Sequence, residues 1–399
     1  MTDVLPAELG EAPSPAAAAA PQRPAAAAEQ RIRLRTFTAD GLLALLGSAA
    51  AAIGFCWVAY ERILPLTGAL GFWLLGYLFF LGVYGVVTAI VWGRRAVVDR
   101  VVAAVMYSTG LLIVGIILDQ IGYTIYRGEP ALRHLNFFTQ TMAQAGARDP
   151  LTVGGVLQAI VGSLMQMGIA TAIAVPLGIL AALFLAEVGG RMARPVRSLV
   201  EAMTSLPEII AGLFIYALFV LSLGFERSGL AAGLALTVMM IPFVARSSEV
   251  MLRLVPQALR EASYALGASQ WRTVWTVVLP TARSGLTTAV VLGMARAIGE
   301  TAPVLLTSGV SPFMNTDPLH HWQTSLPLFI YDAVHYPQQS MIDRGFGAAL
   351  VLIIVVLVLF TIARTVGGKA PGELTRRQRR RIARDLYATS LERASDASA

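Results

Sequence analysis

Stretches of about twenty apolar residues recur along this 399-residue chain, and each is long enough for a helix to cross a bilayer. These stretches limit the possible folds more than any other feature. Because 56% of the residues are hydrophobic and only 14% are charged, the chain lacks the polar surface of a soluble protein. The predicted fold class is therefore an all-α polytopic membrane protein. Its eight predicted membrane helices cover residues 41–60, 69–92, 101–121, 156–186, 200–224, 229–245, 286–309 and 346–366.

The distribution of arginines predicts the orientation of the chain in the membrane. An even number of spans puts both termini on one side, and positively charged segments favour the cytoplasm. Arginines cluster at 31–35, 94–100, 191–197 and 376–381, all on the same side of the predicted helices. We therefore expect both termini in the cytoplasm. Basic segments beside anionic membrane lipid explain the net charge of +7, so no nucleic-acid partner is expected.

Two charged residues, Arg296 and Glu300, lie within the apolar stretch 285–309. A charge at that depth costs about 2.5–3.5 kcal/mol, so it needs a partner, a water-filled cavity or a ligand. On one continuous helix, a spacing of four residues puts both side chains on one face. We expect Arg296, Glu300 and Thr301 to line a substrate pathway, with Glu300 holding Arg296; the alternative is a purely structural ion pair. We expect Glu208 near the cytoplasmic interface rather than in the pathway.

The predicted cytoplasmic segment 246–285 has a pattern of its own. Its residues predict a short helix that Gly267 ends, followed by a second segment that ends before Pro280. Trp271 and Trp275 lie four residues apart and give the second segment an aromatic face. The pattern fits helices that lie on the membrane surface, or an element that docks a cytoplasmic partner.

The same segment resembles the EAA loop in the membrane subunits of ATP-binding-cassette importers. The matching residues are Glu261, Ala262, Gly267, Leu279 and Pro280, with Ser263 and Val277 where the family pattern has alanine and isoleucine. In that family the loop forms a coupling helix that sits in a cleft of the ATPase subunit. The resemblance therefore implies that the five matching residues serve coupling to an ATPase, with Glu261, Ala262 and Gly267 at the contact.

The chain itself lacks a nucleotide-binding loop. Such a P-loop needs Gly-x4-Gly-Lys-(Ser/Thr), and the only lysine, Lys369, is followed by alanine. We therefore expect no enzyme activity and no cofactor in this chain, with ATP and Mg²⁺ bound by a separate ATPase subunit. The single cysteine, Cys56, excludes an internal disulfide. His320 and His321 lack a third ligand at a spacing that suits a metal ion.

Residues 296–301, Arg-x-x-Gly-Glu-Thr, resemble a signature of the permeases of phosphate-specific importers. The continuation through Leu306 resembles the PstA type rather than its PstC-type partner, and the likeness extends over residues 100–370. The resemblance implies a six-helix type I importer core in the inner (plasma) membrane of a prokaryote. It also implies three partners: a homologous PstC-type permease, a homodimeric cytoplasmic ATPase and an external phosphate-binding protein.

Composition and the resemblance together divide the chain. We expect a disordered Ala/Pro-rich cytoplasmic tail at 1–40, two additional transmembrane helices at 41–95, the importer core at 96–368 and a basic cytoplasmic tail at 369–399. Within the core, the coupling loop covers 246–285. The family has no residues to compare with the first two helices, so their role stays open.

Phosphate suits the charged pair on chemical grounds. The planar guanidinium of an arginine binds two acceptor oxygens at once. A monoprotonated phosphate can also donate a hydrogen bond to Glu300, which sulfate cannot. Three alternatives stay open from sequence: a permease for another oxyanion such as sulfate or molybdate, a proton-coupled secondary transporter that uses Arg296 and Glu300 as a relay, and a membrane scaffold in which both are replaceable by apolar residues.

Overall fold

The computed structural model describes residues 39–63 and 68–367, and within these ranges all regular structure is helical. The all-α prediction is therefore confirmed. The predicted basic tail at 369–399 lies outside the described residues, as does the predicted N-terminal tail except for its last two residues, which begin the first helix. Contacts divide the chain into two compact units, with the boundary between Gly115 and Ile116.

The first unit contains a helical hairpin and the beginning of a long helix. Helix α1 (Ala39–Val58) continues into a π-helical turn, α2 covers Ala69–Trp92, and α3 (Arg94–Leu132) continues into the second unit. Between α1 and α2, the rings of Phe55 and Phe79 stack with centroids 3.9 Å apart, and the Cys56 side chain is fully buried. Both helices lie where the apolar stretches predict them. Helix α3 is longer than the predicted span 101–121, because polar turns at both ends remain helical.

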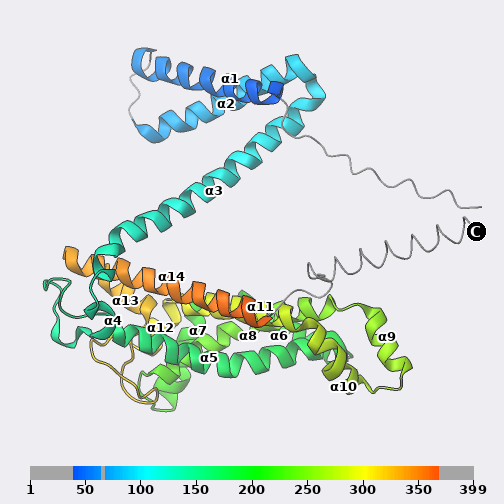
Figure 1. Ribbon diagram of the computed structural model, residues 1–399, viewed down its shortest axis with the longest axis vertical. Coiled ribbons are helices and arrows are strands. Elements are labelled where there is room, and N and C mark those ends of the chain that lie inside the picture. The colour runs from blue at the N-terminus through cyan, green and yellow to red at the C-terminus, as the bar shows by residue number, and fades with distance from the viewer. Residues whose placement is uncertain (1–38, 64–67, 368–399) are drawn as a thin grey trace, which may run out of the picture. The chain divides into compact units, whose positions relative to one another are not determined.

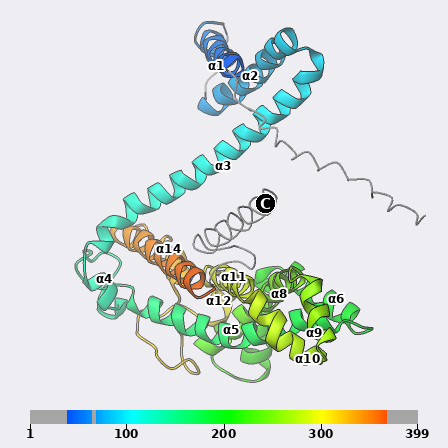
Figure 2. The same cartoon turned by 45° about the vertical axis from the view of Figure 1, so that its right-hand side comes forward.

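The second unit is built from helices that run past one another in the part of the chain after Gly115 (Figure 1, Figure 2). Short π-helical turns extend α5, α7 and α10 at their C-terminal ends. The elements that follow α3 are α4 (Asn136–Thr139), α5 (Leu157–Leu183), α6 (Ala193–Ser205), α7 (Glu208–Ile215), α8 (Gly229–Arg253), α9 (Gln257–Ala265), α10 (Gln270–Thr273), α11 (Leu279–Ile298), α12 (Ala302–Thr307), α13 (Leu326–Ala333) and α14 (Gln339–Gly367).

Helix α8 forms the centre of this unit. Two thirds (67%) of its most apolar window is buried, against 33% for α5 and 22% for α14. Small residues allow its neighbours to approach closely, as is common between membrane helices. A Cβ at Gly178 of α5 would lie 2.8 Å from Val244, and one at Gly233 would lie 2.8 Å from Ile169. The α5–α8 pair is therefore the closely packed framework against which α6, α7, α11, α12 and α13 lie.

The described residues contain seven helices that are long and apolar enough to cross a membrane, or eight if one bent pair counts as a span. The bent pair is α6 with α7, which meet at 102° where a single span over 200–224 is predicted. The cause is Pro207, which disfavours helical geometry at Leu206. The predicted span 286–309 is also wrong, since α11 ends at Ile298. Apolar length identifies membrane segments but not the breaks inside them.

Candidate functional site

The break between α11 and α12 forms the centre of the candidate site. Helix α11 ends at Ile298, Gly299 caps it, and α12 begins at Ala302. The cause is local: glycine is a poor helix former, and Pro303 has no N–H to donate to the carbonyl of Gly299. Arg296 and Glu300 therefore do not lie on one continuous helix. The prediction that they share a helix face is wrong.

The depth of this break follows from how α11 packs on α8. A Cβ at Gly285 would meet Met251, whereas one at Gly293 would meet Val244, so the two helices run in opposite directions. Continuing this register puts the end of α11 beside the middle of α8, a helix of 25 residues. At 1.5 Å per residue, α8 is about 37 Å long. The break therefore lies well inside the apolar region rather than at its edge.

Arg296 pairs with Glu208, not with Glu300 as predicted. Its Nη2 lies 2.5 Å from Oε1 of Glu208, and its Cζ lies 4.3 Å from the centroid of the Phe243 ring. The pair joins the last turn of α11 to the first turn of α7, where the helix dipoles favour a cation and an anion respectively. The expectation that Glu208 lies apart from the pathway pair is therefore wrong. The sequence signal for Glu208 is a carboxylate that directly follows a proline within an apolar stretch.

Glu300 completes a group of three charged side chains. It interacts electrostatically with both Glu208 and Arg296. If all three are ionised, the group carries a formal charge of −1. The side chains of Arg296 and Glu208 remain 46% and 40% exposed, so the group opens onto the surface of this chain. Thr301 is the N-cap residue of α12, but its hydroxyl does not cap that helix.

Close packing holds the two helices beside this group. A Cβ at Gly212 of α7 would lie only 2.5 Å from Cα of Pro303 in α12. Glycine thus allows the two backbones to touch where Glu208 and Glu300 converge. The close contact between Gly212 and Pro303 therefore helps to set the positions of Glu208 and Glu300, although neither charged residue takes part in it.

The predicted coupling loop lies between α8 and α11. Helix α9 ends before Gly267, whose φ of +79° is the left-handed conformation that glycine adopts readily. Ser263 and Thr273 join α9 to α10 through hydroxyl groups 2.8 Å apart. The prediction of a short helix ended by glycine is confirmed. The second segment does not end before Pro280, since α10, its π-helical turn and α11 follow one another without a break.

A buried ion pair attaches this loop to α5. The guanidinium of Arg260 donates to the Glu187 carboxylate, with Nη2–Oε1 at 2.8 Å, and also to the carbonyls of Leu252 and Val255. The Arg260 and Glu187 side chains are 10% and 6% exposed. Gln270 donates to the backbone carbonyl of Glu187, so α10 is attached at the same point. Sequence reasoning missed this pair because its members are 73 residues apart.

The outer face of the loop is exposed, including three residues that match the EAA pattern, Glu261, Ala262 and Gly267. The largest apolar side chains here also face outward, with Leu266 at 90% exposure and Trp271 and Trp275 at 62% and 66%. Of the other matching residues, Leu279 packs against the core while Pro280 is exposed in the first turn of α11. The loop is thus bonded to the rest of the protein on its inner side and exposed on its outer side.

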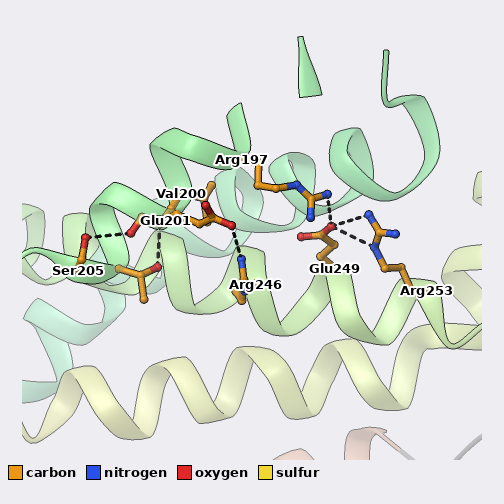
Figure 3. A network of polar contacts seen from close by, with 8 residues as sticks. Arg197, Val200, Glu201, Ser205, Arg246, Glu249 and Arg253 are labelled. Atoms are coloured by element: carbon orange, nitrogen blue, oxygen red, sulfur yellow. Dashed lines mark hydrogen bonds and ion pairs between the residues drawn. The ribbon is translucent and has the colours of Figure 1, made fainter. Parts of the chain in front are cut away.

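A second network of charges ties α6 to α8 (Figure 3). The buried carboxylate of Glu249 accepts from Arg197 of α6 at 2.9 Å and from Arg253 of α8 at 2.8 Å. One turn earlier, Arg246 of α8 pairs with Glu201 of α6 at 3.1 Å, and both side chains are more than half exposed. This network holds α6 against α8, the helix at the centre of the unit.

The segment between α12 and α13 contains the two adjacent histidines. His320 Nδ1 lies 2.8 Å from Asp317 Oδ2, and this hydrogen bond raises the pKa of His320 and lowers the pKa of Asp317. His321 pairs with Glu226 at 3.3 Å. Among the described residues, no cluster of three or more candidate ligands suits a metal ion.

Comparison with known proteins shows which proteins this chain is similar to. Residues 174–367 match the family described as "Binding-protein-dependent transport system inner membrane component". The chain is 39% identical over 267 residues to "Phosphate transport system permease protein PstA 1" of Mycobacterium tuberculosis, covering 67% of this chain and 87% of that protein. It is also 39% identical over 241 residues to "Phosphate transport system permease protein PstA" of Haemophilus influenzae, covering 59% of this chain and 83% of the relative. An inward-facing structure of the MetNI methionine ABC transporter aligns with 53% of this chain and 93% of that chain, at 22% identity and a TM-score of 0.43.

Proposed function

Because the chain belongs to the family of PstA phosphate transport system permeases, we propose that it conducts inorganic phosphate across the inner membrane of a prokaryote. The observation that carries the proposal is Arg296: a guanidinium deep in an apolar region that remains 46% exposed. Such a charge marks a substrate pathway more often than a structural pair. Its fork of N–H donors fits two phosphate oxygens at once.

The two carboxylates beside Arg296 limit how tightly an anion binds. Conduction requires binding that is strong enough to admit phosphate and weak enough to release it. With Glu208 and Glu300 both ionised, the group is net negative, so phosphate binding requires a proton on one carboxyl or a further cation. A homologous PstC-type permease that faces α7 and α11 is the partner expected to supply that cation. Thr301, beside Glu300, adds a hydroxyl to the same pathway.

The exposed outer face of the loop from α9 to α10 is the proposed docking site for a cytoplasmic ATPase dimer. Glu261, Ala262 and Gly267 would contact the ATPase, while Leu279 and Pro280 join the loop to α11. ATP and Mg²⁺ would bind in that partner. Two features support this role: the tryptophans that face outward from the loop, and the buried Arg260–Glu187 pair that fixes its inner side. An external phosphate-binding protein would deliver the substrate.

Uptake of labelled phosphate by vesicles that contain the complete transporter tests the proposal. We expect Arg296→Ala and Arg296→Lys to lower uptake about 10–100-fold, since a charge-assisted hydrogen bond contributes about 1.5–3 kcal/mol. Arg246→Ala is the matched control, because Arg246 also pairs with a glutamate but lies outside the proposed pathway. Unchanged uptake in Arg296→Ala would make the pair structural and would overturn the assignment.

Retention of the ATPase tests the coupling role separately. We expect Glu261→Ala to lower the amount of ATPase that co-purifies with the membrane subunits, whereas Glu201→Ala leaves it unchanged. Uptake that continues in vesicles lacking the ATPase would indicate a proton-coupled carrier instead.

A further inference from the structure

A small polar chamber lies directly behind the charged group. Its polar lining comes from Ser163 and Gln166 of α5, Ser325 before α13, and Glu300 in the break. The centre of a water molecule can occupy about 10 Å³ of this chamber, which is close to the space that one buried water needs. The rest of the lining is apolar, so the four polar side chains border one small space.

Two buried polar atoms at this chamber lack a partner. The Gln166 and Ser325 residues are 1% and 3% exposed, and neither Gln166 Oε1 nor Ser325 Oγ has a hydrogen-bond partner among the described residues. The Gln166 amide orientation is fixed, because its Nε2 donates to the backbone carbonyl of Gln323 at 2.9 Å. Its Oε1 is therefore held as an acceptor without a donor. Buried polar atoms in native proteins are satisfied by protein or by ordered water.

We propose that the chamber holds one ordered water molecule that bridges Glu300 to Gln166 and Ser325. The water donates one hydrogen to Gln166 Oε1 and the other to the Glu300 carboxylate, and it accepts the Ser325 hydroxyl hydrogen. Three such partners are typical of a buried water. Ca²⁺ and Mg²⁺ take six or more oxygen ligands, which a chamber of this size does not accommodate.

The water links the charged group to the segment that precedes α13. Ser163 Oγ accepts from the backbone N–H of Leu326 at 2.7 Å, and the Gln323 carbonyl accepts from Gln166 Nε2 at 2.9 Å. Both ends of that segment are therefore bonded to the chamber walls. Through the water, the direction of the Glu300 carboxylate depends on the position of this segment. This functional part of the inference rests on the proposed phosphate pathway.

Ser325→Ala in the complete transporter is the decisive variant, with Ser248→Ala as its matched control. Ser248 is 0% exposed and its hydroxyl also lacks a partner among the described residues, but it does not line the chamber. In a dry chamber, both substitutions remove an unsatisfied hydroxyl and leave the midpoint of thermal unfolding unchanged or raised. With a bound water, only Ser325→Ala lowers the midpoint of thermal unfolding, because it removes a hydrogen-bond partner of that water.

Cryo-electron microscopy of the native transporter, at a resolution that shows ordered water, supplies the direct measurement. We expect one density peak among Gln166, Ser325 and Glu300, lost or weakened in Ser325→Ala. We also expect the phosphate concentration for half-maximal uptake to rise about fivefold in Ser325→Ala, with the maximal rate unchanged. Absence of the peak, or equal behaviour of Ser325→Ala and Ser248→Ala, overturns the water site. If Arg296→Ala retains uptake while the peak is present, the water site stands and the proposed function fails.

Discussion

Neutralising Glu187 should release the loop between α8 and α11 from the end of α5. In Glu187→Gln the side chain keeps its shape, but the buried Arg260 guanidinium loses its counter-charge. Arg260 still donates to the Leu252 and Val255 carbonyls, so its remaining hydrogen bonds hold it in a pocket that is only 10% exposed. Breaking one partner of a buried ion pair costs about 3–5 kcal/mol. The lower value corresponds to a change of about 100-fold in an equilibrium constant.

Hydrogen exchange measures that equilibrium directly. Amide protection reports the free energy of local opening, so the backbone amides of α9 and α10 should exchange about 100-fold faster in Glu187→Gln. Protection in the α5–α8 framework should stay unchanged. The matched control is Glu201→Gln, which removes one partner of an ion pair whose side chains are 54% and 53% exposed. Exposed pairs contribute about 0–1 kcal/mol, so this control should alter exchange little.

A functional readout accompanies the exchange. Because the loop contacts the proposed ATPase on its outer face and α5 on its inner face, Glu187→Gln should lower phosphate uptake more than it lowers ATPase retention. The reasoning is refuted if α9 and α10 exchange at native rates in Glu187→Gln, or if Glu201→Gln speeds their exchange equally.

Three further predictions follow from other contacts. Gly212→Ala should lower stability and uptake, since its Cβ would lie 2.5 Å from Cα of Pro303; thermal unfolding and uptake would both be measured. Glu249→Gln should loosen α6 from α8 by about 1 kcal/mol, because Arg197 of α6 is partly exposed and loses only the charge of its carboxylate partner; protease cleavage within α6 would report the change. Asp317→Asn should lower the pKa of His320, whose hydrogen bond to Asp317 raises it. The stabilising contribution of protonated His320 is present below its unfolded-state pKa and is lost as pH rises through the raised pKa of the folded state. NMR titration of labelled histidine would measure the pKa of His320 in both proteins.

The membrane helices were predictable because apolar length alone identifies them. The predicted spans 69–92 and 156–186 lie within a few residues of α2 and of α5 with its π-helical turn. The breaks were not predictable in the same way, since a proline inside a membrane helix either kinks it or ends it. Pro176 and Pro242 lie inside α5 and α8, whereas Pro207 and Pro303 stand at helix starts. The deciding factor is whether neighbouring helices satisfy the freed carbonyls, which sequence does not state.

The candidate site was partly predictable for a related reason. Arg296 and Glu300 stood out because charges in apolar stretches are rare and costly. Assigning partners from spacing failed, because the i,i+4 rule holds only on a continuous helix. Glu208 lies 88 residues from Arg296 in sequence, and only the packing of α7 against α12 brings them together. The same limit applies to Glu187 and Arg260, whose pairing follows from where α5 ends.

The exposure of the charged group argues that this chain holds only half of a site. An ion pair with side chains 46% and 40% exposed at this depth cannot face hydrocarbon without a cost of several kcal/mol. The surface beside α7 and α11 must therefore meet water or a polar protein face. With a net charge of −1 on three ionised groups, an anionic substrate further requires either a proton on one carboxyl or a cation that this face brings. The proposed homologous permease, with an intramembrane arginine of its own, would meet both requirements. In such a complex, Arg296→Ala alone should weaken phosphate binding in graded fashion, whereas loss of both arginines should abolish it.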